Sequence, residues 1–215
     1  IAIQDLDAIV SDEIDGVVIP KVNNQSEINH LTLRLIELER KKAMSKKIGI
    51  MASIESAQGL VNSYSIATAD SRVKMLVFGM FDFLNDMGLD YVQDGIEYSF
   101  ARAKIPIDAR AAGIGAIDAI WQKVDDVEGL VQDASTAKRL GYQGKCVIHP
   151  NQVEPVANVF IPSNNEINWA RKVIQALEET MEKGMGIGAV TVDGRMVDAA
   201  HYRQAKSVLD SLNTK

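Results

Sequence analysis

IGIMASIE at residues 48–55 is a short apolar run that ends at a carboxylate, and MLVFGMFD at residues 75–82 repeats the pattern. Continuous apolar runs of this length predict buried parallel strands. Each run delivers an acid, Glu55 or Asp82, where its strand ends, and catalytic groups of α/β barrels collect at the carboxyl ends of strands. Two carboxylates with little basic charge nearby in sequence suit a hard divalent cation such as Mg²⁺. The alternative is that each acid caps the helix that follows it.

The composition is that of an ordinary globular protein. The chain has 215 residues, of which 47% are apolar and 24% charged, enough for one large domain with a sizeable core. A net charge of −6 argues against a nucleic-acid binder. No apolar run is long enough to span a bilayer, and no signal-peptide pattern opens the chain. The single cysteine, Cys146, excludes an internal disulfide and favours a reducing compartment, so we expect a cytoplasmic enzyme.

Apolar runs alternate with amphipathic segments along most of the chain. Strands are predicted at residues 17–22, 48–54, 74–78, 115–120 and 145–148. Helices are predicted around residues 28–38, over 57–70, up to 112–113, over 126–140 and over 164–183, with Pro106 either kinking the third helix or starting another. Because parallel strands need crossover connections, five strand–helix units at this spacing predict a parallel sheet.

The C-terminal residues differ in character. Residues 184–188, GMGIG, are typical of a flexible hinge. Two apolar runs flank Asp193-Gly194, which is a strong hairpin signal, and a terminal helix is predicted over 199–212. We therefore expect a main domain at residues 1–183 and an appendage or lid at residues 184–215.

Six short motifs, in order, resemble the signatures of the citrate lyase beta subunit-like family. They are PKV at 20–22, IESAQG at 54–59, FGMFDF at 78–83, AID at 116–118, GKCVIHP at 144–150 and DGRMVD at 193–198. This family belongs to the aldolase/citrate lyase superfamily, which also holds malyl-CoA and citramalyl-CoA lyases. The resemblance implies an α/β fold, a TIM (β/α)8 barrel, of which this chain supplies strands 4–8 plus a C-terminal lid. Because five strands cannot close such a barrel, we expect the chain to be incomplete at its N-terminal side.

The resemblance also implies a reaction. Residues matching Glu55 and Asp82 bind Mg²⁺ in the family. A 2-oxo acid or the corresponding hydroxy acid can chelate that ion, which then acts as a Lewis acid on the carbonyl or alkoxide oxygen. We expect cleavage of a citramalyl-CoA, malyl-CoA or citryl-type thioester to an acetyl thioester and a 2-oxo acid.

A lid aspartate completes the expected site. Asp198 matches the residue that, in malyl- and citramalyl-type lyases, reaches the active site from a neighbouring subunit and exchanges a proton with the acetyl methyl carbon. This implies a homo-oligomer, such as a trimer, with lid exchange. The family usually has a proline two residues later, where this chain has Ala200. The alternative is that Asp198 caps the terminal helix.

Three further residues resemble the coenzyme A-facing part of the family's site. His149 and Pro150 follow the last predicted strand, and Asp118 resembles a residue that lines the thioester channel. Asp118 could instead cap the next helix, and His149 could be a structural hydrogen-bonding group. The carrier of the acyl group is coenzyme A or an acyl carrier protein.

Two other functions stay open at the level of sequence. One is an acyl-CoA thioesterase or malate synthase-like variant, and the other is a non-catalytic subunit of a lyase complex. An arginine that the family places on its third strand, to stabilise the enolate oxygen, is not found in this sequence. We therefore expect very low lyase activity from these 215 residues alone.

Overall fold

The computed structural model describes residues 3–92, 95–182 and 188–212. The chain divides into two compact units, Ile1–Phe160 and Ile161–Lys215. The helix α9 (Asn164–Glu182) belongs to the second unit, so the division falls before this helix and not at the expected boundary 183/184. Apart from Gly188, the predicted hinge at 184–188 lies outside the described residues.

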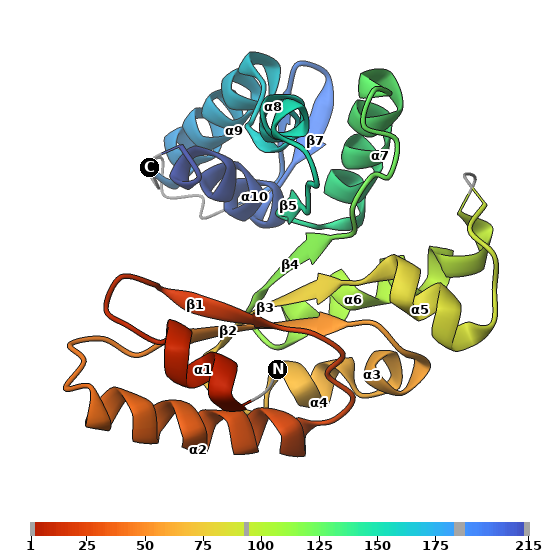
Figure 1. Ribbon diagram of the computed structural model, residues 1–215. Helices are drawn as coiled ribbons and strands as arrows, with labels where there is room; N and C mark the ends of the chain where they lie inside the picture. Colours follow the sequence, from red (N-terminus) through yellow and green to blue (C-terminus); the bar gives the residue numbers. More distant parts are fainter. Residues whose placement is uncertain (1–2, 93–94, 183–187, 213–215) are drawn as a thin grey trace. The chain divides into compact units, whose positions relative to one another are not determined.

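The first unit is built on a five-stranded parallel sheet, as predicted. Its strands are β1 (Gly16–Ile19), β2 (Gly49–Ile54), β3 (Val73–Phe78), β4 (Gly115–Asp118) and β5 (Gly144–Lys145), in this spatial order (Figure 1). Strand β1 ends before the predicted residue 22, because Pro20 has no N–H to donate and Lys21 turns with a φ of 54°. Strand β5 is also shorter than predicted. The α/β class and the parallel sheet are confirmed, whereas a closed (β/α)8 barrel is a prediction that these strands do not establish.

Helices connect the strands. Those predicted from sequence are α2 (Gln25–Lys41), α3 (Ala57–Val61) with α4 (Ser63–Ala67), α6 (Ser99–Ala111) and α7 (Val127–Leu140). The predicted helix at 57–70 is divided at Asn62, and α6 continues through Pro106 as one helix. The elements α1 (Ile3–Ile9), η1 (Ile96–Tyr98), α5 (Met80–Met87), η2 (Pro150–Gln152) and α8 (Val153–Phe160) complete the unit.

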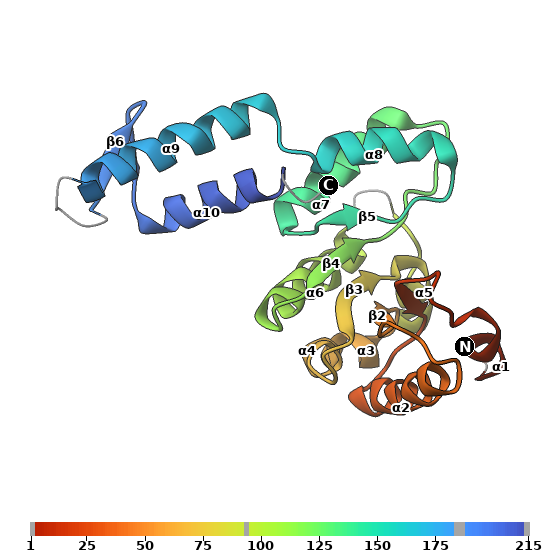
Figure 2. The ribbon, with the colours of Figure 1, turned by 90° about the vertical axis from the view of Figure 1, so that its left-hand side faces the viewer.

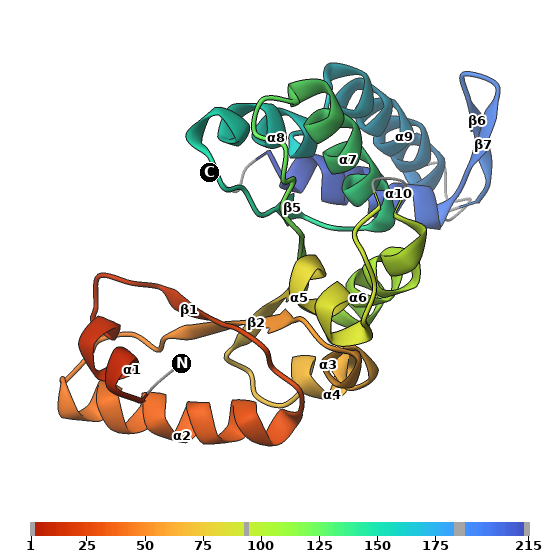
Figure 3. The same cartoon turned by 45° about the vertical axis from the view of Figure 1, so that its right-hand side comes forward.

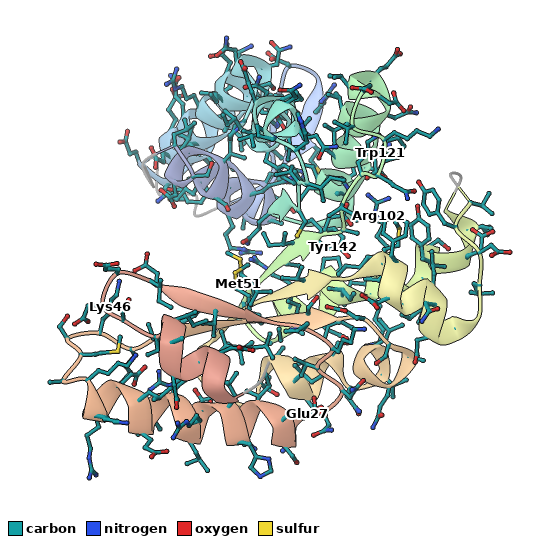
Figure 4. The ribbon with its side chains drawn as sticks, viewed as in Figure 1. Glu27, Lys46, Met51, Arg102, Trp121 and Tyr142 are labelled. Atoms are coloured by element: carbon teal, nitrogen blue, oxygen red, sulfur yellow. The ribbon has the colours of Figure 1, made fainter. Side chains whose placement is uncertain are left out.

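The core lies on one face of this sheet. The side chains of Ile50, Ala52 and Ile54 in β2 are fully buried, and so is Ile28 of α2. Figure 3 shows α2, α3 and α4 along this face. Because side chains alternate along a strand, Met51 points to the opposite face, where it is half-buried (Figure 4).

The second unit is a helix pair with a hairpin. Helix α9 packs against α10 (Ala199–Asp210), and β6 (Val190–Val192) pairs antiparallel with β7 (Arg195–Val197) (Figure 2). Asp193 and Gly194 both have positive φ, as a two-residue hairpin turn requires, so the predicted hairpin is confirmed. Buried side chains on α9, β6, β7 and α10 form a separate small core: Ala170, Val173, Leu177, Val192, Val197 and Ala205. This shared core explains why α9 is part of the second unit.

Within the residues described here, none of the helices combines the length and apolar character needed to cross a membrane.

Candidate functional site

The ends of β2 and β3 lie side by side. Ile54 is in register with Phe78, and the Gly79 N–H donates to the Ile54 carbonyl at 3.0 Å. The Glu55 side chain then crosses directly over Gly79, where an added Cβ would lie 2.3 Å from the Glu55 Cγ. A side chain at position 79 would therefore displace Glu55. In the sequence, the only indication of this packing constraint was the glycine within the apolar run 75–82.

Asp82 reaches the same place from the first turn of α5, a helix that the sequence did not predict. The buried side chains of Phe83 and Leu84 anchor this helix to the core, and Asp82 itself is exposed. After the Lys21 ammonium, the Glu55 carboxyl group also lowers the pKa of Asp82, so the two acids lie close together. The structure thus brings together the two predicted metal ligands.

Neither acid caps a helix, so that alternative is wrong. Helix α3 is capped by Ser56, whose hydroxyl accepts from the Gly59 N–H at 3.0 Å. Helix α5 begins after Gly79, which has no side chain to donate or accept. The carboxylates of Glu55 and Asp82 are therefore not used as helix caps.

A positive charge already lies against this pair. The Lys21 ammonium is 2.8 Å from Asp82 Oδ1, in a salt bridge at the rim of the sheet. The hydrogen bond from Lys21 is the main cause that holds the pKa of Asp82 below its ordinary value, with a smaller contribution from Glu55, while partial burial opposes the shift. Asp82 is thus ionised at neutral pH.

The residues present fit a magnesium ion with few protein ligands. Two converging carboxylates attract a cation, and Lys21 shows that a cation can lie against Asp82. No group of three or more His, Cys, Asp or Glu side chains suited to a metal is found among the described residues. Mg²⁺ commonly takes one or two carboxylates and keeps its other positions for water and substrate, so the donor set suits it.

Asp118 has a different environment from the one expected. Its carboxylate is fully buried, with Oδ1 accepting from Arg102 Nε at 3.0 Å and Oδ2 lying 2.7 Å from both Arg102 Nη2 and Lys145 Nζ. Asp133 of α7 also contacts Arg102, at 2.8 Å, and Lys145. We name Arg102, Asp118, Asp133 and Lys145 the buried charge cluster. Figure 4 shows Arg102 near Tyr142, whose hydroxyl donates to the Arg102 carbonyl at 2.8 Å.

The buried charge cluster favours a structural role for Asp118. Both of its oxygens are used by side chains of this chain, and the cap of α7 is Asp126, not Asp118. Burial alone would lower the pKa of Arg102, but the carboxylates of Asp118 and Asp133 raise it above its ordinary value. Arg102 is therefore charged. A role for Asp118 toward a thioester stays a prediction, and the helix-cap alternative for it is wrong.

His149 and Pro150 lie in the loop after β5. The half-buried His149 accepts from the Asn151 N–H through Nδ1 at 3.2 Å, and Pro150 starts the short helix η2. Gln152 ties this loop down by accepting from the Ile148 N–H at 3.0 Å and donating to the Trp121 carbonyl at 3.1 Å. The contacts of His149 are those of a structural group, and the predicted contact of His149 and Pro150 with coenzyme A stays a prediction.

Asp198, in the second unit, caps α10. Its Oδ1 accepts from the Ala200 N–H at 2.9 Å and contacts His201 Nδ1 at 2.8 Å. The hydrogen bond from the His201 side chain is the main cause that lowers the pKa of Asp198, so this exposed carboxylate is ionised at neutral pH. The capping interpretation is confirmed, and it leaves the carboxylate accessible.

Cys146, the single cysteine, is half-buried. Burial raises the pKa of its thiol, so the side chain is protonated and unreactive at neutral pH.

We predict that Gly79→Ala weakens Mg²⁺ binding about tenfold or more, because the new methyl group displaces Glu55 from Asp82. Isothermal titration calorimetry of the wild type and the variant measures this effect. Gly144→Ala is the matched control, since a Cβ there would meet only the end of the Ile117 side chain, at 3.2 Å. If Gly79→Ala binds Mg²⁺ as tightly as Gly144→Ala does, the new methyl group does not displace Glu55 and the prediction is contradicted.

We predict that Asp118→Asn lowers the free energy of unfolding by about 3 kcal/mol or more, because it leaves Arg102 and Lys145 buried with one carboxylate between them. Urea denaturation measures the change. Asp125→Asn removes the same charge from an exposed position and should change stability by less than about 0.5 kcal/mol. A stable Asp118→Asn protein with impaired thioester binding would instead favour the ligand-binding interpretation.

Comparison with known proteins supports the relationship that the motifs indicated. The chain is 35% identical over 212 residues to the citrate lyase subunit beta of Leuconostoc mesenteroides subsp. cremoris, covering 97% of this chain and 69% of that protein. It is 32% identical to a (3S)-malyl-CoA thioesterase of Cereibacter sphaeroides, covering 95% of this chain and 67% of that protein. The chain thus spans about two thirds of the length of these relatives.

Solved structures agree with this result. The protein CitE of Mycobacterium tuberculosis in complex with magnesium, acetoacetate and coenzyme A matches with a TM-score of 0.71 and 27% identity, over 93% of this chain and 68% of that one. The model of the HpcH/HpaI aldolase/citrate lyase family matches residues 1–150. The chain therefore belongs to the HpcH/HpaI aldolase/citrate lyase family.

Proposed function

We propose that this chain is part of a Mg²⁺-dependent carbon–carbon lyase that cleaves a 3-hydroxyacyl thioester to an acetyl thioester and a 2-oxo acid. The observation that carries the proposal is the convergence of Glu55 and Asp82 at the carboxyl ends of two neighbouring parallel strands. The sequence relatives include a citramalyl-CoA lyase and citrate lyase beta subunits, which supports this class of substrate.

The carboxylate pair would hold the cation and orient the substrate. A divalent ion bound there supplies Lewis acidity to an oxygen of the 2-oxo or hydroxy acid. Packing over Gly79 holds Glu55, and the buried residues in the first turns of α5 hold Asp82. Both carboxylates are therefore pre-positioned. Such fixed geometry reduces the reorganisation that the reaction requires.

Asp198 is proposed as the group that moves the proton. In the cleavage direction the Asp198 carboxylate would take the proton of the substrate hydroxyl, the carbon–carbon bond would break, and its electron pair would pass to the thioester fragment. The Asp198 carboxyl group formed in this way would return the proton to the carbon of that fragment, and in the condensation direction its carboxylate would remove a proton from the same carbon. We propose that it comes from another copy of the chain in a homo-oligomer, such as a trimer, with residues 188–212 acting as a lid.

The fold proposal follows the same resemblance. The half-buried side chains of Met51 and Met75, on the sheet face turned away from α2, are compatible with the interior of a (β/α)8 barrel to which β1–β5 contribute five strands. We also propose a cytoplasmic location, with coenzyme A or an acyl carrier protein bearing the acyl group.

The test of the metal site uses two charge-removing variants. Glu55→Gln and Asp82→Asn keep the side-chain shape, and each should abolish measurable Mg²⁺ binding in calorimetric titration, because only two protein carboxylates hold the ion. The far-ultraviolet circular dichroism of both variants should match the wild type. Unchanged Mg²⁺ affinity in both would refute the proposed function and favour a non-catalytic subunit.

The runner-up function is thioester hydrolysis, which the malyl-CoA thioesterase relative supports. Product analysis separates the two reactions. Acetyl thioester and 2-oxo acid appear together in equal amounts if the lyase proposal holds. Free coenzyme A without 2-oxo acid would show a thioesterase.

We predict that Asp198→Asn lowers turnover about 100-fold or more while leaving the thermal unfolding midpoint unchanged. Asparagine caps a helix as well as aspartate does, but it cannot exchange the proton. Asp198→Ala removes both functions and should lower turnover and stability together. Full activity of Asp198→Asn would limit this residue to its capping role.

A further inference from the structure

Lys21 holds an unusual position beside the carboxylate pair. It follows β1 and adopts a left-handed backbone conformation with a φ of 54°, which is uncommon for a residue other than glycine. Its ammonium contacts Asp82 Oδ1 at 2.8 Å, although 66% of the Lys21 side chain and 50% of the Asp82 side chain stay exposed. Because both side chains are exposed, an ion from solvent can replace this contact.

The turn at Lys21 is supported on both sides. Asn23 Nδ2 donates to the Lys21 carbonyl at 3.0 Å, and the Val22 N–H donates to the Ser53 carbonyl at 3.1 Å. The Ser56 hydroxyl then donates to Asn23 Oδ1 at 2.5 Å. These bonds connect the turn after β1 to the end of β2 and the start of α3. The strained conformation of Lys21 is thus held by its surroundings, as is common at functional sites.

A divalent ion and the Lys21 ammonium compete for the same oxygen atoms. Glu55 and Asp82 together offer two negative charges when ionised, and Lys21 balances one of them. An ion of charge +2 at the pair would balance both carboxylates and repel the ammonium at short range. Because the existing ion pair is exposed, it is weak enough to be replaced.

We propose that Lys21 is an exchangeable counter-cation of the Glu55–Asp82 pair, which occupies Asp82 in the metal-free protein and leaves it when a divalent ion binds. This inference rests on the proposed metal site and adds a positioning residue to it. Lys21 keeps the two acids together before loading, and it lowers the affinity of the site for the ion.

The test measures binding of Mn²⁺ alone, as a probe ion, to the full chain by electron paramagnetic resonance of the free hexaaqua ion. Lys21→Gln should bind Mn²⁺ about two- to fivefold more tightly than the wild type, since removal of the competitor is worth no more than an exposed ion pair. Lys21→Arg keeps the charge and should bind Mn²⁺ no more tightly than the wild type.

Lys46→Gln is the matched control. Lys46 also forms an exposed ion pair, at 2.6 Å from Asp15, but it precedes β2 at the opposite end of the sheet, as Figure 4 shows. Its substitution removes the same net charge and should leave Mn²⁺ affinity unchanged. If Lys46→Gln binds Mn²⁺ as tightly as Lys21→Gln does, the net charge of the chain acts over long range. That result would overturn the exchange at Asp82.

The remaining outcomes separate this inference from the proposed function. Wild-type Mn²⁺ binding that is lost in Asp82→Asn but not tightened in Lys21→Gln keeps the metal site and overturns the exchange. Weaker binding in Lys21→Gln, with unchanged circular dichroism, overturns it as well. Mn²⁺ binding that does not depend on Asp82 refutes the metal site itself.

Discussion

The candidate site depends on the register between β2 and β3. Ile54 pairs with Phe78, so the next residue of each strand, Glu55 and Gly79, leaves the sheet at the same level. A shift by one residue would turn Glu55 to the other face of the sheet, because side chains alternate along a strand. The same register places α5 directly after Gly79, which brings Asp82 to Glu55 within one helical turn. Backbone pairing thus determines the distance between two carboxylates that lie 27 positions apart in the sequence.

The buried charge cluster and the group of Lys21, Glu55 and Asp82 differ in burial, and therefore in how readily they exchange ionic partners. The buried charge cluster holds two cations and two carboxylates, each contacting both members of the other sign, and it joins β4 and β5 to α6 and α7. Separation of any of these pairs would leave a charge in a medium of low polarity, so the cluster cannot readily exchange partners. In the group of Lys21, Glu55 and Asp82, the lysine and the aspartate are exposed and Glu55 is half-buried, and carboxylates outnumber cations. It can therefore accept an additional cation from solvent.

The strands and the convergence of Glu55 and Asp82 could be predicted because both follow from local patterns. Apolar runs predict strands, and their ends place Glu55 and Asp82 at one edge of a parallel sheet. The first turn of α5 was missed because its apolar residues continue the run of β3 without a change of period. The role of Asp118 was not predictable, since its partners Arg102, Asp133 and Lys145 come from separate elements that only the tertiary structure brings together.

The boundary between the two units also depends on tertiary contacts that local sequence patterns do not reveal. Helix α9 follows the first unit in sequence with regular helical spacing, so its own residues do not show which core it joins. Its buried residues Val173 and Leu177 pack with Val192 and Val197 of the hairpin, and these contacts assign it to the second unit. The hairpin would otherwise have little to pack against, because a two-stranded ribbon is barely stable in water. The core shared with α9 and α10 therefore gives the segment before Asp198 a fixed conformation, which a residue proposed to transfer a proton requires.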